Sequence, residues 1–296
     1  MTKDIGWELY RSFLSVLKEG SLSGAARALG IAQPTVGRHI AALEGSLGVT
    51  LFTRSQVGLL PTEAAQTLEP FAQAMSSSAA ALKRAAEGHG SGIQGTVRIT
   101  ASEVMGVEVL PPILAQLQSE HPGLKVELML SNRVQDLLKR EADIAVRMTP
   151  PKQEQLIARR VGQVSLGLHA HKKYLRKRGT PQSLADLTQH ALIGFDEETP
   201  FVRAARKGFP VWQRDAFAFR TDSDVAQLAL IRAGCGIGIC QVALAAREPQ
   251  LVQLLPDGLT LGLETWLTMH EDLRHTPRCK AAFDALLQGL TLYVSA

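Results

Sequence analysis

The sequence predicts a multi-domain α/β protein built in three parts. A winged helix-turn-helix occupies residues 1–61, a long linker helix and its hinge occupy residues 62–91, and a bilobal α/β domain occupies residues 92–296. Three observations predict this order. Short helical patterns separated by glycines fill residues 1–61, one long helical pattern follows, and strands alternate with helices from residue 95 onward.

The composition narrows the class of protein. Hydrophobic residues make up 45% of the chain and charged residues 20%, which is normal for a globular protein with buried cores. No apolar run approaches the roughly 18 residues of a membrane span, and no secretion signal is visible, so we expect a cytoplasmic protein with no membrane partner. The net charge of +4 permits nucleic-acid binding without arguing for it.

The cysteines and histidines predict neither a metal site nor an enzyme. Cys235, Cys240 and Cys279 form neither a disulfide framework nor a zinc-ligand spacing. No histidine has a nucleophile and an orienting acid at a recognisable spacing, so we predict no catalytic residue and no cofactor. Cys235 and Cys240 are interpreted as small buried apolar residues, and a thiol redox sensor of the same fold is the alternative.

The first sixty residues or so contain the helix-turn-helix, at about 22–41. Apolar residues at helical spacing predict a first helix over residues 5–18. Ser23 is the expected N-cap of the second helix, and Gly30 ends it. Pro34 lies in the first turn of the third helix, where a missing N–H costs little.

The third helix has one apolar stripe and one polar face. Val36, Ile40, Leu43 and Leu47 form the buried stripe. The opposite face can contact bases and phosphates, because Gln pairs with adenine, Arg with guanine or phosphate, and a Thr methyl with thymine. Two interpretations of His39 stand side by side: contact with a base, and a solvated or phosphate-contacting side chain. The predicted DNA-contacting residues, including one wing residue, are Gln33, Pro34, Thr35, Arg38, His39 and Arg54.

This segment resembles the DNA-binding region of LysR-type transcriptional regulators. The residues that carry the resemblance are Phe13, Gly20, Ser21, Ala25, Ala26, Leu29, Gln33, Pro34, Val36, Arg38, Ile40, Leu43, Glu44, Leu47, Gly48, Leu51, Phe52, Arg54 and Thr62. The family usually has serine at the positions of Ala32 and Gly37. Loss of the Ser cap lowers the stability of the third helix by roughly 1 kcal/mol, and Gly37 inside that helix lowers it by about as much again.

A helix is predicted over residues 63–87, followed by a glycine-rich hinge. Its small apolar residues repeat at heptad spacing, which favours pairing with a second copy, and Pro70 should kink the helix near its start. Packing of the helix on its own domain is the alternative. The resemblance likewise implies a linker helix that pairs two subunits. The predicted dimerisation residues are Leu68, Ala72, Met75, Ala79, Leu82 and Ala86.

The remaining sequence predicts two α/β lobes with a mainly parallel sheet. Strands are expected at residues 96–100, 124–130 and 143–147, with helices at 107–119 and 134–140 between them. A second run includes a strand at 217–221 and a helix at 224–233. Lobe I spans about 92–164 plus 268–296, lobe II spans about 165–267, and a final helix at 277–290 returns to lobe I.

A small, polar or anionic effector is expected in the cleft between the lobes, where strands end. This domain resembles the LysR effector-binding domain, itself similar to periplasmic solute-binding proteins. The predicted effector-binding residues are Ser102, Ser131, Asn132, Arg147, Phe195, Phe201, Thr221 and Asp222. The resemblance implies double-stranded operator DNA, a homodimer or homotetramer, and RNA polymerase as a candidate partner. A solute-binding module is the competing class, and the attached winged helix argues against it.

Overall fold

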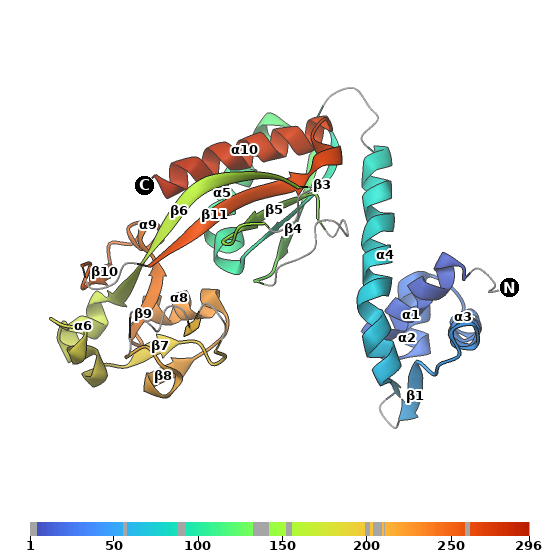
Figure 1. Cartoon of the computed structure of the whole chain (residues 1–296), viewed down its shortest axis with the longest axis horizontal. Coiled ribbons are helices and arrows are strands. Elements are labelled where there is room, and N and C mark those ends of the chain that lie inside the picture. The colour runs from blue at the N-terminus through green and yellow to red at the C-terminus, as the bar shows by residue number, and fades with distance from the viewer. Residues whose placement is uncertain are drawn as a thin grey trace. The chain divides into compact units, whose positions relative to one another are not determined.

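A computed structural model describes residues 5–55, 58–87, 93–132, 142–151, 156–198, 202–203, 209, 211–257 and 261–295 (Figure 1). The predicted helix at 134–140, the glycines of the hinge and Phe201 lie outside these residues. The chain forms two compact units, and the boundary between them falls inside one helix, between Lys83 and Arg84. None of the helices in the described ranges is long and apolar enough to span a bilayer.

The N-terminal unit is a helical core with a two-stranded wing. Its elements are α1 (Trp7–Glu19), α2 (Leu22–Leu29), α3 (Gln33–Leu47), β1 (Phe52–Ser55), β2 (Gly58–Pro61) and most of α4 (Glu63–Glu87). Gly20, Gly30 and Gly48 follow the first three helices with φ of 65°, 67° and 71°, a conformation that glycine adopts without a Cβ clash. The winged helix-turn-helix is therefore confirmed, and α4 runs through Pro70 without a break.

The cap of α2 differs from the prediction. Ser21, not Ser23, is the N-cap, because its backbone is extended and its hydroxyl accepts a 3.1 Å hydrogen bond from the Gly24 amide. Ser23 lies inside the first turn. At α3 the N-cap is Ala32, whose side chain makes no capping bond, as the missing serine predicts.

The C-terminal unit is a mixed α/β domain. In chain order its elements are β3 (Gly95–Ala101), η1 (Met105–Val109), α5 (Leu110–Glu120), β4 (Leu124–Leu130), β5 (Ile144–Arg147), β6 (Leu156–His171), α6 (Lys172–Arg178), η3 (Ala185–Gln189), β7 (Leu192–Gly194), η4 (Arg214–Ala216), β8 (Phe217–Arg220), α8 (Asp224–Arg232), β9 (Ile237–Gln241), α9 (Val242–Ala245), β10 (Leu251–Leu254), β11 (Leu261–His270), η5 (Glu271–Leu273) and α10 (Pro277–Val294).

The sheet is mixed, so the prediction of a mainly parallel sheet was wrong. Among the described residues its strand order is β4-β3-β5-β11-β6-β9-β7-β8, and β10 pairs with β6. The outer pairs β3–β4 and β7–β8 are parallel. The long strands β6 and β11 are antiparallel to each other and cross between the lobes (Figure 1). Among the described residues, every antiparallel pair of this sheet involves β6 or β11, and local sequence patterns do not reveal the direction of these two strands.

Each lobe has its own hydrophobic core. In lobe I, the strands β3, β4 and β5 pack against α5 and α10, with Ile99, Leu117 and Leu286 fully buried. In lobe II, Leu168, Leu187 and Phe209 belong to a separate cluster. Helix α10 packs in the core of lobe I, which confirms the prediction that the final helix returns to this lobe. The helix extends to Val294, beyond the predicted end at residue 290.

The predicted helix at 107–119 begins instead with a π-helical turn, η1. The amide of Leu110 donates to the carbonyl of Met105, five residues earlier. Pro111 and Pro112 follow in the first turn of α5 and have no N–H to continue the hydrogen bonding of η1. The wider turn places Glu108 against lobe II, where it contacts Arg232.

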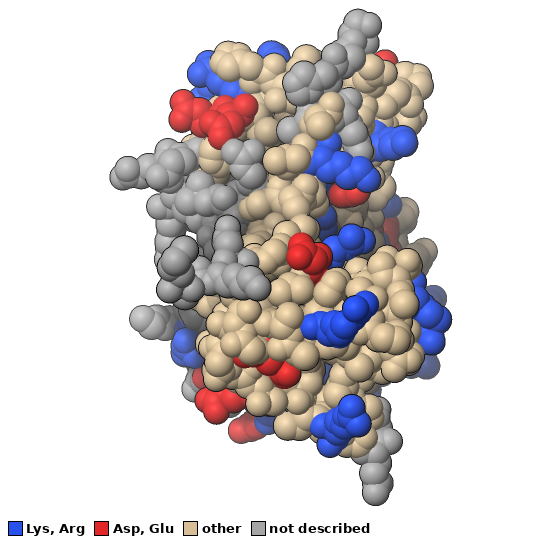
Figure 2. All heavy atoms as spheres, turned by 90° about the vertical axis from the view of Figure 1, so that its right-hand side faces the viewer, with Lys and Arg blue, Asp and Glu red and all other residues tan. Residues whose placement is uncertain are grey.

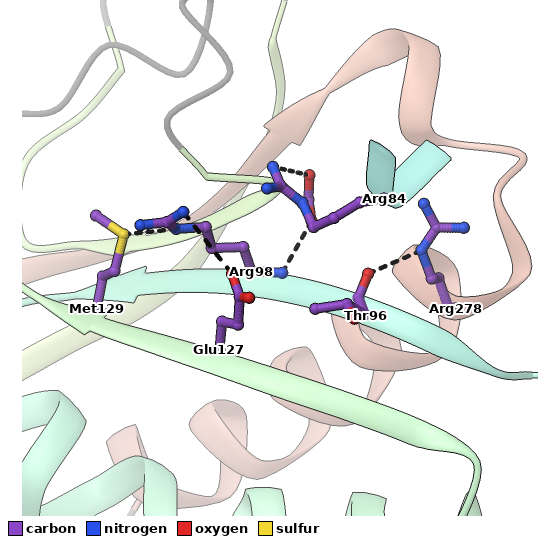
Figure 3. A network of polar contacts seen from close by, with 7 residues as sticks. Arg84, Thr96, Arg98, Glu127, Met129 and Arg278 are labelled. Atoms are coloured by element: carbon purple, nitrogen blue, oxygen red, sulfur yellow. Dashed lines mark hydrogen bonds and ion pairs between the residues drawn. The ribbon is translucent and has the colours of Figure 1, made fainter. Parts of the chain in front are cut away.

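A buried polar network crosses the first strand of lobe I (Figure 3). Arg84, in the last turn of α4, donates Nε and Nη2 to the two carboxylate oxygens of Asp143, each at 3.1 Å. Asp143 also accepts a 2.8 Å bond from the Arg98 amide of β3. Arg278 of α10 donates to the carbonyl oxygen of Thr96 at 2.9 Å. The network joins the end of α4, β3 and α10 within the C-terminal unit.

Candidate functional site

The first turns of α3 present a polar surface. Val36, Ile40 and Leu43 are buried against α1 and α2, which fixes the opposite face outward. Gln33 and Arg38 are exposed, and Arg38 Nη2 donates to Thr35 Oγ1 at 3.2 Å. Four of the predicted contact residues, Gln33, Pro34, Thr35 and Arg38, therefore share the exposed start of one helix. Donors and acceptors in this arrangement can meet base edges in a major groove.

His39 differs from its neighbours on α3. Its Nδ1 lies 2.8 Å from Oγ of Ser12, which is buried in α1. The ring is half-buried and connects the recognition helix to the first helix. The geometry suits a residue that positions α3 better than one that contacts bases. Sequence reasoning did not single out Ser12, because one serine on an amphipathic helix carries no distinguishing signal.

The wing is fixed to α3 by one carboxylate. Glu44 Oε1 accepts bonds from the amides of Leu51 at 2.7 Å and Phe52 at 3.3 Å, at the start of β1. Arg54 follows on β1, opposite Leu59 of β2, and its side chain is exposed. The Leu59 amide also bonds the carbonyl of Gly20 at 2.9 Å. The wing therefore holds Arg54 at a defined position next to the helical core.

The apolar residues of α4 divide between two surfaces. Leu68 and Ala72, two of the six predicted dimerisation residues, pack on the core of the N-terminal unit. Met75, Ala79, Leu82 and Ala86 are exposed. Phe71, which the heptad pattern does not include, is 66% exposed and lies one turn before Met75. We call Phe71, Met75, Ala79, Leu82 and Ala86 the exposed α4 stripe.

Three predicted effector residues meet at one edge of lobe I. Ala101 of β3 is paired with Leu130 of β4 and with Val146 of β5. Ser102, Ser131 and Arg147 each follow one of these three paired residues, so they lie at the same edge of the sheet. The Ser131 amide donates to the Ala101 carbonyl at 2.9 Å. Arg147 Nη2 donates to Thr100 Oγ1 at 2.8 Å, and burial lowers the pKa of Arg147 to about 10.

The predicted residues of lobe II stabilise a turn at the end of β8. Asp222 Oδ1 accepts bonds from the amides of Asp196 at 3.0 Å and Glu197 at 2.8 Å. The Thr221 amide donates to the Gly194 carbonyl at 3.0 Å. Asp222 therefore braces the loop after β7, where Phe195 is half-buried.

The two lobes contact each other through four residues, three of which the sequence did not single out. Ser223 Oγ of lobe II donates to Glu103 Oε2 of lobe I at 2.9 Å. Asn132 Nδ2 donates to Asp224 Oδ2 at 3.0 Å, while its own carbonyl oxygen accepts from the Glu103 amide. Burial and the nearby Glu103 raise the pKa of Asp224 to about 6, against the opposing effect of the Asn132 bond. Only Asn132 of these four was predicted.

A second contact between the lobes surrounds Arg232 of α8. Its guanidinium bonds both carboxylate oxygens of Glu108, at 2.6 and 2.9 Å, and also Glu248 at 2.6 Å. The bond from Arg232 lowers the pKa of Glu108. Arg247 donates to the Glu108 carbonyl at 3.1 Å and lies 5.1 Å from the centre of the Tyr293 ring. These charge-assisted bonds hold η1 against lobe II.

Replacing Asp224 by asparagine tests the lobe contact through pH. The raised pKa means that ionising Asp224 costs the folded state free energy at pH 7. That cost disappears as the pH falls through about 6 towards the ordinary value of 3.8. Lowering the pH from about 7 to about 5 should therefore add about 1 kcal/mol to the stability of the C-terminal unit through this group.

Calorimetry at the two pH values measures the effect. Asp224→Asn should remove this increment while keeping an acceptor for Asn132. Asp215→Asn, at an exposed position, should leave it unchanged. An Asp224→Asn protein with the same pH dependence as the parent would show that Asp224 does not titrate in this range.

The cysteines do not form a reactive pair of thiolates. Burial raises the pKa of Cys240 and of Cys279 to about 12. Cys235 is half-buried beside the Cys240 cluster. In the part of the chain that the structure describes, no group of three or more His, Cys, Asp or Glu side chains could hold a metal ion. Neither observation favours a thiol sensor.

Two family models match the chain. Residues 7–66 match the bacterial regulatory helix-turn-helix protein, lysR family. Residues 90–291 match the LysR substrate binding domain. Together the two matches cover both units. They agree with the resemblance that the N-terminal residues carry.

Individual proteins show similarity over the same regions. An HTH-type transcriptional regulator of Xanthomonas campestris pv. campestris is 28% identical over 65% of this chain and 56% of its own length. The HTH-type transcriptional regulator CrgA of Neisseria meningitidis is 32% identical over 62% of each chain. The matches thus span less than two thirds of these two relatives.

Two solved structures have the same fold along nearly the whole chain. The structure of CrgA from Neisseria meningitidis has a TM-score of 0.61 and 26% identity, covering 98% of this chain and 99% of that one. Full-length CbnR, crystallised with its target DNA, has a TM-score of 0.67 and 21% identity, covering 96% and 99%. The second likeness concerns the fold alone.

Proposed function

Because this chain belongs to the LysR family of bacterial transcriptional regulators, we propose that it recognises operator DNA through Gln33, Thr35 and Arg38 at the start of α3. The observation that carries this proposal is the exposed polar turn of α3 on a buried apolar stripe. Its N-terminal end fits a major groove, where Arg and Gln can distinguish bases. Pro34 shapes that turn, and Arg54 on the wing contacts phosphate or the minor groove.

A single winged helix should bind DNA weakly. Residues 1–60 contain six basic and four acidic side chains. On the face drawn in Figure 2, Lys and Arg side chains lie at several separate places instead of gathering in one patch. Phosphate contacts supply much of the affinity of such proteins, so two winged helices must bind the DNA together. We therefore propose a dimer paired through the exposed α4 stripe, which assembles further into a tetramer.

The proposed effector is a small anionic molecule in the cleft between the lobes, held at the strand ends that carry Ser102, Ser131 and Arg147. Support comes from the partly buried guanidinium of Arg147, whose pKa is lowered by burial. A carboxylate or phosphate beside it would form charge-assisted bonds in a low-dielectric site. The carboxylates of Glu103 and Asp224 occupy the lobe contact, so the anion is expected on the Arg147 side.

Effector binding would act by changing how the lobes meet. An effector can shift the protein between two arrangements only if it binds one of them better. The bond between Asn132 and Asp224 in this arrangement is one that an effector would replace or preserve. Asp222 would line the cleft from lobe II. Phe195 and Thr221 would complete the lining of the cleft. A cytoplasmic location and contact with RNA polymerase complete the proposal.

Arg38→Ala tests the DNA-reading surface. Losing one good base contact costs about 1–3 kcal/mol, so a dimer with two readers should lose about a hundredfold in operator affinity. The measurement is a mobility-shift titration on the DNA upstream of the protein's own gene. Arg11→Ala removes the same charge from the exposed surface of α1 and should change affinity little. Equal losses in the two variants would remove Arg38 from the reading surface.

A further inference from the structure

The highest concentration of positive charge lies far from α3 in the sequence. Helix α6 has the sequence KKYLRKR and contains five basic side chains in seven residues. The whole chain has 32 basic and 28 acidic side chains, so without these five it would be net negative. None of the five forms an ion pair with another described residue. All five are exposed, which means that their charge faces solvent.

The helix is held rigidly at both ends and along one face. The Lys172 amide donates to the Gln250 carbonyl at 2.9 Å, and His171 Nδ1 accepts from the Lys173 amide at 3.0 Å. The Gly179 amide donates to the Leu175 carbonyl at 2.8 Å and closes the helix. On the inner face, the buried Tyr174 hydroxyl accepts a 2.9 Å bond from the Ala191 amide. The outer side chains therefore project from a fixed support.

A groove runs along one side of this helix. It has a volume of about 330 Å³ and is lined, among the described residues, by Lys172, Leu175, Arg176, Thr180 and Gln250. Lys172 and Arg176 are four residues apart, so they project from the same face of α6. Leu175 supplies a half-buried apolar floor that belongs to the core of lobe II. Each of the four polar lining side chains can donate a hydrogen bond, and none is an acid.

We propose that this groove binds the phosphoryl group of a small phosphorylated molecule, with Lys172 and Arg176 as its charged ligands. Arg presents a planar fork of donors that matches phosphate oxygens, and Lys adds a compact point charge. The Thr180 hydroxyl and the Gln250 amide supply uncharged donors beside them. The groove is separate from the cleft between the lobes.

Phosphate could also arrive as part of a DNA backbone, and the same side chains would bind it. Inorganic pyrophosphate and a short duplex of unrelated sequence distinguish the two sources. The key variant is Lys172→Ala/Arg176→Ala. The matched control is Lys177→Ala/Arg178→Ala, which removes two charges from the same helix outside the groove. All four residues are exposed, so both proteins should fold.

Isothermal titration of the full-length protein with pyrophosphate is the first measurement. We expect the groove variant to bind at least about tenfold more weakly than the parent. The control should lose less than about threefold, because its charges act only through screened long-range attraction. Equal weakening in the two variants, or no weakening in the groove variant, would overturn the proposal.

Duplex titrations at several salt concentrations complete the test. If the groove holds backbone phosphates, the groove variant should lower the salt slope by about 2 relative to the control, and pyrophosphate should compete with the duplex. That result would assign the phosphoryl site to DNA and overturn its assignment to a small molecule. Absence of both pyrophosphate binding and this slope difference would refute a phosphoryl site. The Arg38→Ala mobility-shift assay is a separate measurement. The proposal of operator recognition and the proposal of a phosphoryl site can therefore each fail without the other.

Discussion

Replacing Arg84 by alanine is expected to lower the free energy of unfolding of the C-terminal unit by about 3 to 5 kcal/mol. Arg84 is 5% exposed and Asp143 is 4% exposed, so the substitution leaves a buried carboxylate without its counter-charge. The Arg98 amide still donates to Asp143, but one neutral bond does not offset the loss of a bidentate ion pair. Scanning calorimetry of the full chain would measure the transition of this unit.

Two further variants separate the ion pair from other effects. Lys83→Ala, at the exposed neighbouring position, should change stability by less than about 0.5 kcal/mol. Arg84→Ala/Asp143→Ala should recover part of the loss, because it removes the unpaired charge. If the double variant were as unstable as the sum of the two single variants, the ion pair would not be the cause.

Introducing a charge into the exposed α4 stripe is expected to abolish dimers at micromolar concentration. Leu82 is 74% exposed and Phe71 is 66% exposed, which is unusual for large apolar side chains on one helix face. In a two-fold symmetric pair, Leu82→Glu acts twice, so it should weaken association about a thousandfold or more. Operator affinity should fall with it, since the two winged helices would then bind independently.

Sedimentation of the purified protein would measure the state of association. Leu292→Glu provides a matched control, because Leu292 is 69% exposed on α10 and lies outside the stripe. That variant should remain dimeric. A Leu82→Glu protein that also remains dimeric would show that subunits pair through another surface.

The N-terminal unit could be predicted from sequence almost to the residue because its signals are local. Apolar spacing marks the buried faces of α1 and α3, and glycines in left-handed conformations end the helices. The cap of α2 was placed two residues late, since Ser21 and Ser23 are equally plausible until the backbone is known. In the C-terminal unit, a local pattern of the same kind predicts the strand Leu124–Leu130 with correct ends.

Contacts distant in sequence could not be predicted in the same way. Glu103 and Ser223 are separated by 120 positions, and neither belongs to a recognisable motif. The direction of β11 depends on where the chain re-enters the sheet, which periodicity does not encode. On α4, a repeating apolar pattern cannot tell which residues cover their own domain, and Ala72 does so whereas Met75 does not.

The return of α10 to lobe I has a consequence for how the chain is made. Cys279, Phe283, Leu286 and Leu290 belong to the same core as Ile99 of β3, so this core joins segments from the two ends of the unit. A chain emerging from the ribosome can complete its winged helix early, whereas lobe I must wait until residues 277–294 have been synthesised. Until then β3, β4 and β5 leave an apolar face uncovered.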